Sequence, residues 1–120
     1  MYCIRTDDNI LVNNKIHNST YTALHLGGYE DTIKYNTFQD NNVAVYVSAT
    51  YFNSTIRYNN FINNNINVMH NSQIRYDFDF SNNYWGIDQN NSTAIAAKIV
   101  DICVSQDSEG MIIYWPYYIQ

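Results

Sequence analysis

The chain repeats one hexapeptide pattern, which reads IKYNTF at Ile33–Phe38 and IRYNNF at Ile56–Phe61. Related segments lie on either side, with LVNNKI at Leu11–Ile16 and FSNNYW at Phe80–Trp85. All four segments open and close on a large apolar residue and carry asparagine at the fourth position. Their starts, at residues 11, 33, 56 and 80, are 22, 23 and 24 residues apart. A period of this length is typical of a solenoid in which each repeat forms one coil.

A second motif between these segments alternates with the period of a β-strand. It reads ALHL at Ala23–Leu26, AVYV at Ala44–Val47 and NVMH at Asn67–His70. Alternation by two places His25, Tyr46 and Met69 on one face, opposite an apolar face. The segments are too short for the apolar stripe of a helix, which recurs over ten or more residues. Two or three short strands in each repeat predict a coil of a parallel β-helix, stacked about 4.8 Å from the next.

We therefore predict an all-β fold of about three to four coils of 22–24 residues. The coils span residues 1–86, and a C-terminal cap spans residues 87–120. We expect parallel pairing between residues 9 and 86 at offsets of 22–24. The predicted interior consists of Ile33, Phe38, Val45, Ile56, Phe61, Val68 and Trp85.

Asparagine occurs nineteen times in the 120 residues. The repeated Asn14, Asn36, Asn59 and Asn83 fall where the chain turns between apolar positions. Asparagine tolerates the left-handed backbone of such corners, and its amide can donate and accept hydrogen bonds. We predict that these four side chains form a structural ladder along the axis.

The pattern changes after Gly86. Ser92 is the predicted N-cap of a short helix with apolar residues at Ile95, Ile99 and Ile102. An apolar strand follows at Met111–Trp115. A helix-plus-strand cap of this kind would cover the last coil, whose unpaired backbone and apolar core invite aggregation. Residues 2–6 resemble part of an earlier coil, so we expect further coils of a parent β-helix before residue 1.

The closing segment contains NNYWG at residues 82–86, KIVD at 98–101, GMIIY at 110–114 and Pro116-Tyr117. With these motifs it resembles the closing segment of right-handed parallel β-helix proteins of the NosD-like and pectin-lyase-like repeat families, and the resemblance covers roughly residues 9–119. It implies a right-handed coil, an extracellular, cell-surface or periplasmic location, and a role in carbohydrate binding or adhesion. Fold alone does not determine function, because the superfamily also contains lyases and hydrolases.

Composition excludes several classes of partner. A net charge of −5 and a pI near 4.8 argue against nucleic acid, which requires a basic face. No apolar run of about 18 residues could span a membrane. Cys3 and Cys103 are expected to remain unpaired thiols.

No catalytic, metal or cofactor site is predicted. The acidic residues do not repeat with a matching partner at the coil spacing, as paired catalytic carboxylates would. Lys34 and Arg57 occupy equivalent positions one coil apart, where an anion or a neighbouring aspartate would relieve their repulsion. His25 and Met69 lie on one face but two coils apart, about 9–10 Å, which is too far for shared metal ligation.

The predicted function is a non-catalytic structural or binding segment, with a polysaccharide or cell-surface glycan as the expected partner. Its candidate binding residues are His25, Tyr46 and Met69, with Ala44 and Asn67 beside them. The alternative is the C-terminal tail of a polysaccharide lyase or hydrolase whose catalytic coils lie upstream.

Overall fold

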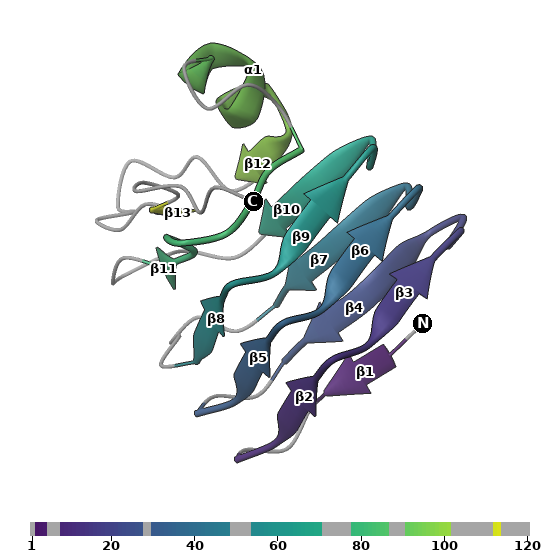
Figure 1. Cartoon of the computed structure of the whole chain (residues 1–120), viewed down its shortest axis with the longest axis vertical. Helices are drawn as coiled ribbons and strands as arrows, with labels where there is room; N and C mark the ends of the chain where they lie inside the picture. The colour runs from purple at the N-terminus through teal and green to yellow at the C-terminus, as the bar shows by residue number, and fades with distance from the viewer. Residues whose placement is uncertain are drawn as a thin grey trace.

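The computed structural model describes residues 2–4, 8–27, 30–48, 54–70, 78–86, 91–101 and 112–113. Each coil contributes one strand to each of three parallel sheets (Figure 1). The long sheet contains, in order, β1 (Tyr2–Ile4), β4 (Thr22–Leu26), β7 (Val43–Val47), β10 (Ile66–His70) and β12 (Ile99–Asp101). The first short sheet contains β2 (Ile10–Val12), β5 (Thr32–Lys34) and β8 (Thr55–Arg57). The second short sheet contains β3 (Lys15–His17), β6 (Thr37–Gln39) and β9 (Asn60–Ile62).

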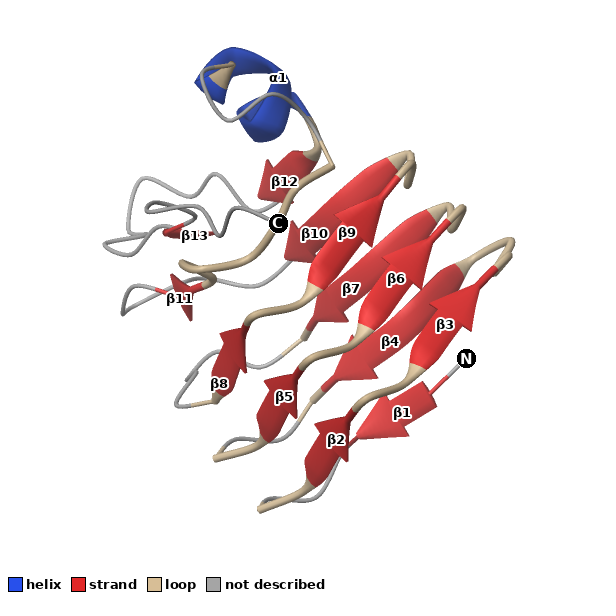
Figure 2. Cartoon of the chain, viewed as in Figure 1, coloured by secondary structure: helices blue, strands red, loops and turns tan. Residues whose placement is uncertain are grey.

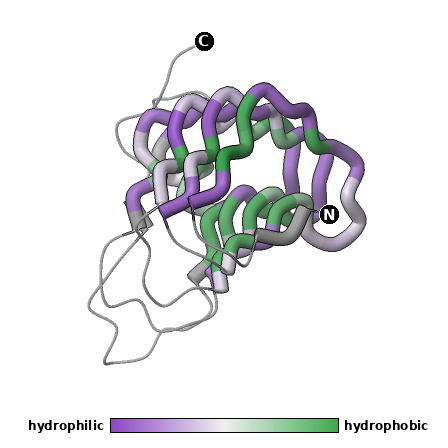
Figure 3. The backbone as a smooth tube through the Cα atoms, turned by 90° about the horizontal axis from the view of Figure 1, so that it is seen from below, coloured by the Kyte–Doolittle hydropathy of each residue, from purple (hydrophilic) through white to green (hydrophobic). Residues whose placement is uncertain are grey.

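Parallel pairing between successive coils confirms the predicted β-helix. Ile33 pairs with Leu11 in the coil before it and with Ile56 in the coil after it. Viewed from below, the coils lie one behind another (Figure 3). Parallel strands cannot be joined by tight hairpins, so each strand returns to its sheet only after a full coil.

One offset differs from the prediction of 22–24. Leu24 pairs with Val45, which is an offset of 21 residues between β4 and β7. The chain uses four residues to pass from β3 to β4 but only three to pass from β6 to β7. The backbone N–H of Asn42 bonds to the carbonyl of Ser19, and that of Val43 bonds to the carbonyl of Tyr21. Thr20 is therefore an extra residue in the first of these turns.

The core contains every residue predicted to lie inside. Ile33, Phe38, Val45, Ile56, Phe61, Val68 and Trp85 are all buried. Three of them stack along the axis, with ring centroids 5.1 Å apart for Phe38 and Phe61 and 4.7 Å apart for Phe61 and Trp85. Since each ring comes from a different coil, the stack ties three coils together.

The four repeated asparagines hydrogen-bond from coil to coil at the corner between the two short sheets, here named the first corner. Asn59 Oδ1 accepts from the backbone N–H and the Nδ2 of Asn36, at 3.0 and 3.1 Å. Asn59 Nδ2 donates to the carbonyl of Ile33 at 2.9 Å. Asn14 donates to Asn36, and Asn59 to Asn83, in the same way. The amides thus satisfy buried backbone groups that no strand can pair.

The left-handed residue at the first corner is not the ladder asparagine, as expected from the sequence, but the residue before it. Positive φ occurs at Asn13, Tyr35, Tyr58 and Asn82, with values of 58–60°. The turn needs one left-handed residue. When the residue before the asparagine takes this conformation, the asparagine side chain can join the ladder. The sequence-based prediction gave the left-handed backbone and the ladder hydrogen bonds to the same asparagine. In the structure the residue before it is left-handed, and the asparagine forms the ladder bonds.

The C-terminal part covers the last coil with a helix and further strands (Figure 2). The helix α1 spans Ser92–Ala97, and Asn91, not Ser92, is its N-cap, accepting from the Ala94 N–H at 3.0 Å. The expected helical Ile99 begins β12 instead and pairs with Val68. A two-stranded parallel sheet of β11 (Phe78–Asp79) and β13 (Ile112–Ile113) lies beside the coils. Cys103 and most of the predicted strand Met111–Trp115 lie outside the described residues.

Gly86 lies against the backbone of β9. Its φ is +65°, and a Cβ there would lie 2.5 Å from the carbonyl oxygen of Phe61. Glycine is therefore required twice over, for its backbone conformation and for the absence of a side chain.

Candidate functional site

The predicted binding residues line up across the outer face of the long sheet. His25 pairs with Tyr46, and Tyr46 pairs with Met69. The rings of His25 and Tyr46 meet edge to face, with centroids 4.9 Å apart at 75°. His25 Nε2 lies 2.9 Å from Ser48 Oγ. All three side chains are half-buried, and the rings of His25 and Tyr46 contact each other across the strands.

The two residues expected beside this strip are not accessible. Ala44 is fully buried and Asn67 is 1% exposed. Asn67 Oδ1 accepts from Asn64 Nδ2 at 3.1 Å, so its amide points into the molecule. Simple alternation placed both residues on the outer face. Ala44–Val45 and Asn67–Val68 are each two successive buried residues, so burial in the long strands does not follow strict alternation.

A polar surface lies instead at the corner between the second short sheet and the long sheet, here named the second corner. Its left-handed residues are Asn18, Asp40 and Asn63, with φ of 54–59°. Behind them, the buried Asn41 and Asn64 form another ladder, in which Asn64 Oδ1 accepts from the backbone N–H and the Nδ2 of Asn41 at 3.0 Å. This ladder holds three coils in register beneath the surface.

The solvent side of the second corner repeats polar side chains at the coil spacing. Asn65 Nδ2 donates to Asn42 Oδ1 at 3.2 Å, and Asn63 Nδ2 donates to Asp40 Oδ1 at 2.6 Å. Each of these amides carries more donors and acceptors than one bond uses. They border an open hollow of about 630 Å³. It is lined by Asn18, Ser19, Thr20, Asp40, Asn41, Asn42, Asn63 and Asn65.

An exposed tyrosine stands at the edge of this hollow. The extra residue Thr20 lengthens the turn, and Tyr21 after it is 82% exposed. A second hollow of about 520 Å³ is lined by Asn18, Ser19, Thr20, Tyr21 and Thr22. The two hollows share Asn18, Ser19 and Thr20, so an aromatic ring and a row of amides border one continuous surface.

Part of this site was visible in the sequence. Asn41-Asn42 and Asn64-Asn65 both precede the alternating motif and are 23 residues apart. That repetition marks a corner with outward-facing amides. Tyr21 takes the position before the long strand that Asn42 and Asn65 take in the following coils, and all three side chains are exposed.

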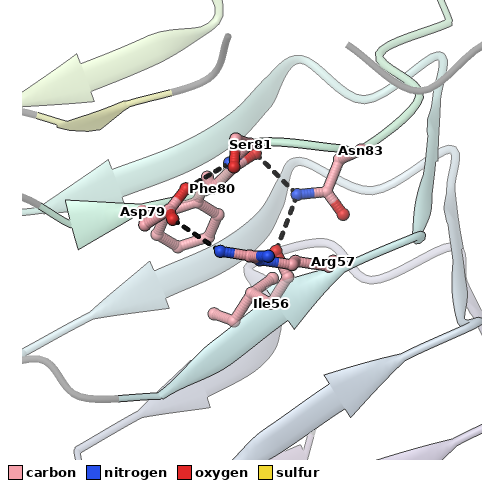
Figure 4. Close-up of polar contacts among 6 residues, drawn as sticks. All are labelled: Ile56, Arg57, Asp79, Phe80, Ser81 and Asn83. Atoms are coloured by element: carbon pink, nitrogen blue, oxygen red, sulfur yellow. Dashed lines mark hydrogen bonds and ion pairs between the residues drawn. The ribbon is translucent and has the colours of Figure 1, made fainter. Parts of the chain in front are cut away.

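The equivalent cations Lys34 and Arg57 are adjacent across the first short sheet, and an aspartate lies near one of them. Arg57 Nη2 donates to Asp79 Oδ2 at 2.9 Å (Figure 4). The Ser81 backbone N–H donates to Asp79 Oδ1 at 2.9 Å. Burial acts to raise the pKa of Asp79, but hydrogen bonds from Ser81 and the Arg57 guanidinium outweigh it and hold the pKa below its ordinary value. The site is a structural ion pair at the last coil.

This lowered pKa predicts acid sensitivity of the last coil. A carboxyl whose folded-state pKa is depressed stabilises the fold above its unfolded pKa and loses that contribution as pH falls through the folded value. We expect Asp79→Asn to make the melting midpoint less dependent on pH below about pH 4. Melting curves at neutral and acidic pH test this, with the exposed Asp8→Asn as control. An unchanged pH dependence in Asp79→Asn would contradict it.

Comparison with known proteins agrees with the stacked-coil architecture. Residues 1–101 match the model of a family described as periplasmic copper-binding protein (NosD). The chain belongs to the NosD family. The match covers the coils, α1 and β12, so membership of the NosD family extends beyond Gly86 into the predicted cap. No curated protein and no solved structure matches the chain. No helix in the described part of the chain is long and apolar enough to cross a membrane.

Proposed function

We propose that this chain is a non-catalytic binding segment that holds an extended, neutral glycan along the second corner. The observation that carries the proposal is the exposed Tyr21 beside a row of amides repeated from coil to coil. An aromatic ring provides a flat apolar face for a sugar ring, and amides match the paired donors and acceptors of sugar hydroxyls. Coils about 4.8 Å apart present such groups periodically, which suits a polymer better than a compact ligand.

From this proposed glycan binding we infer that the protein lies outside the cytoplasm, in the periplasm or at the cell surface, where extended glycans are found. The family's description as periplasmic supports this location.

Copper, which the family's description names, does not fit the described residues. No group of three or more histidine, cysteine, aspartate or glutamate side chains comes together among them. His70 is buried in the core, His25 is bonded to Ser48, and His17 Nδ1 lies 2.8 Å from Asn18 Nδ2. A copper site needs converging imidazole, thiolate or thioether ligands. We therefore derive no role of this segment through copper.

A glycan array probed with the soluble segment, followed by titration of the best neutral oligosaccharide, tests the proposal. Tyr21→Ala is expected to weaken binding about twofold to twelvefold, because an aromatic contact contributes about 0.5–1.5 kcal/mol. Tyr21 is almost fully exposed, so the melting midpoint should not change.

Tyr46→Ala is the matched control, and it also tests the strip of His25, Tyr46 and Met69 on the long sheet. The proposal expects this variant to bind as well as the parent. Binding that survives Tyr21→Ala but is lost in Tyr46→Ala would move the site to the long sheet. Absence of any bound polysaccharide would leave the segment with a structural role alone.

A further inference from the structure

Two tyrosines of the first corner occupy a backbone conformation that bulky residues avoid. Tyr35 and Tyr58 have φ of 58° and 59°, whereas the same position in the flanking coils is taken by Asn13 and Asn82. Asparagine enters this region readily, but a bulky residue there is strained by about 1–3 kcal/mol. Strain of this kind is retained where the side chain has a use that a better-suited residue would not serve.

The two rings form a stacked ledge on the outside of the corner. Their centroids are 5.7 Å apart and their planes are inclined by only 12°. Tyr58 covers one face of Tyr35, yet Tyr35 remains 58% exposed. Its other face is directed toward the coil of Asn13, whose short, exposed side chain cannot cover it. The ledge therefore ends in an open aromatic face.

A cation occupies the position before Tyr35 in the chain. Lys34 precedes Tyr35 on the outer side of β5, in register with Val12 and Arg57. Arg57 forms an ion pair with Asp79, whereas Lys34 forms no ion pair within the described part of the chain. The corner thus combines a flat apolar surface with an ammonium group that has no ion-pair partner among the described residues, in a protein whose net charge is −5.

We propose that Tyr35, Tyr58 and Lys34 form a binding site for an acidic sugar residue, a uronate. The pyranose ring lies on the open face of Tyr35, and its carboxylate accepts a charge-assisted hydrogen bond from Lys34 Nζ. This site is separate from the second corner, since the three residues of β6, about 10 Å of chain, lie between them. It does not depend on neutral glycan binding there.

Titration of the soluble segment with tetragalacturonate and with its carboxyl-reduced, neutral counterpart tests this site. The parent is expected to prefer the uronate about twofold to fivefold, as for an exposed ion pair, and the preference should shrink at high salt. Lys34→Gln should abolish the preference while leaving the weaker binding of the neutral sugar.

Tyr35→Asn separates a binding role from a structural one, because asparagine is the residue found at this corner in the flanking coils. We expect uronate binding to fall about twofold to twelvefold, as the aromatic face is lost. The melting midpoint should stay level or rise, because the backbone strain is relieved. Tyr21→Ala is the control and should bind the uronate like the parent.

Two results would overturn the inference. The first is absence of uronate binding by the parent. The second is unchanged uronate affinity in Tyr35→Asn, and a lowered melting midpoint of that variant would then show that the stack only steadies two coils. None of these results bears on the neutral glycan at the second corner, whose test uses Tyr21.

Discussion

Phe61→Ala is expected to lower the free energy of unfolding by about 3–5 kcal/mol. Phe61 is fully buried and is the middle ring of the stack that joins Phe38 to Trp85. Its loss removes both ring contacts and leaves a cavity that neighbouring coils cannot collapse to fill, since their strands are held in register. A domain of ordinary stability, about 5–15 kcal/mol, would lose a large share of it.

Denaturant unfolding of the parent and the variant measures this difference. Ile10→Ala is the control, because Ile10 is 72% exposed and its truncation should cost little. Comparable losses in Phe61→Ala and Ile10→Ala would contradict the assignment of Phe61 to the centre of the core.

Asn59→Ala is expected to destabilise the fold by about 2–5 kcal/mol, although it removes no apolar surface. The variant leaves the backbone N–H of Asn36 and the carbonyl of Ile33 without the partners they have in the ladder. Each buried polar group left unpaired costs about 1–3 kcal/mol. A buried amide in this ladder therefore matters nearly as much as a core ring.

Asn60→Ala is the matched control for this prediction. Asn60 is the next residue, is only partly buried, and donates a single long bond of 3.4 Å to Thr37 Oγ1. We expect its replacement to change the unfolding free energy by less than about 0.5–1 kcal/mol. Equal effects of Asn59→Ala and Asn60→Ala in denaturant unfolding would show that the ladder is not a special feature.

The repeat made the fold predictable. The spacing of the hexapeptides specifies which residues pair, and the large apolar residues at their ends mark positions that face inward, because both follow from the geometry of parallel strands. The errors concern short-range details. The register of β4 with β7 shifts by one residue because of Thr20, and Asn91 caps α1 in place of Ser92. Boundaries of this kind depend on single hydrogen bonds, which a pattern of apolar residues does not encode.

The candidate site was less predictable than the fold. Alternation correctly aligned His25, Tyr46 and Met69, but it also placed the buried Asn67 on the surface. Burial in the long strands departs from strict alternation at this position, and no residue type marks the departure. Binding by the His25, Tyr46 and Met69 strip stays a prediction.

The strain at Tyr35 and Tyr58 was also invisible in the sequence. Their position in the hexapeptide is filled by asparagine in two coils and by tyrosine in the other two. Only the backbone angles show that the tyrosines occupy a conformation suited to the asparagines.

The most direct test of the account is an NMR titration of the isotope-labelled segment with the neutral oligosaccharide that binds best on the glycan array. Side-chain amide signals report each asparagine separately. The account predicts shifts for the exposed Asn42, Asn63 and Asn65, together with the ring signals of Tyr21, while the buried ladder amides of Asn36 and Asn59 stay unchanged. Shifts confined to His25, Tyr46 and Met69, or no shifts at saturating sugar, would contradict binding along the second corner.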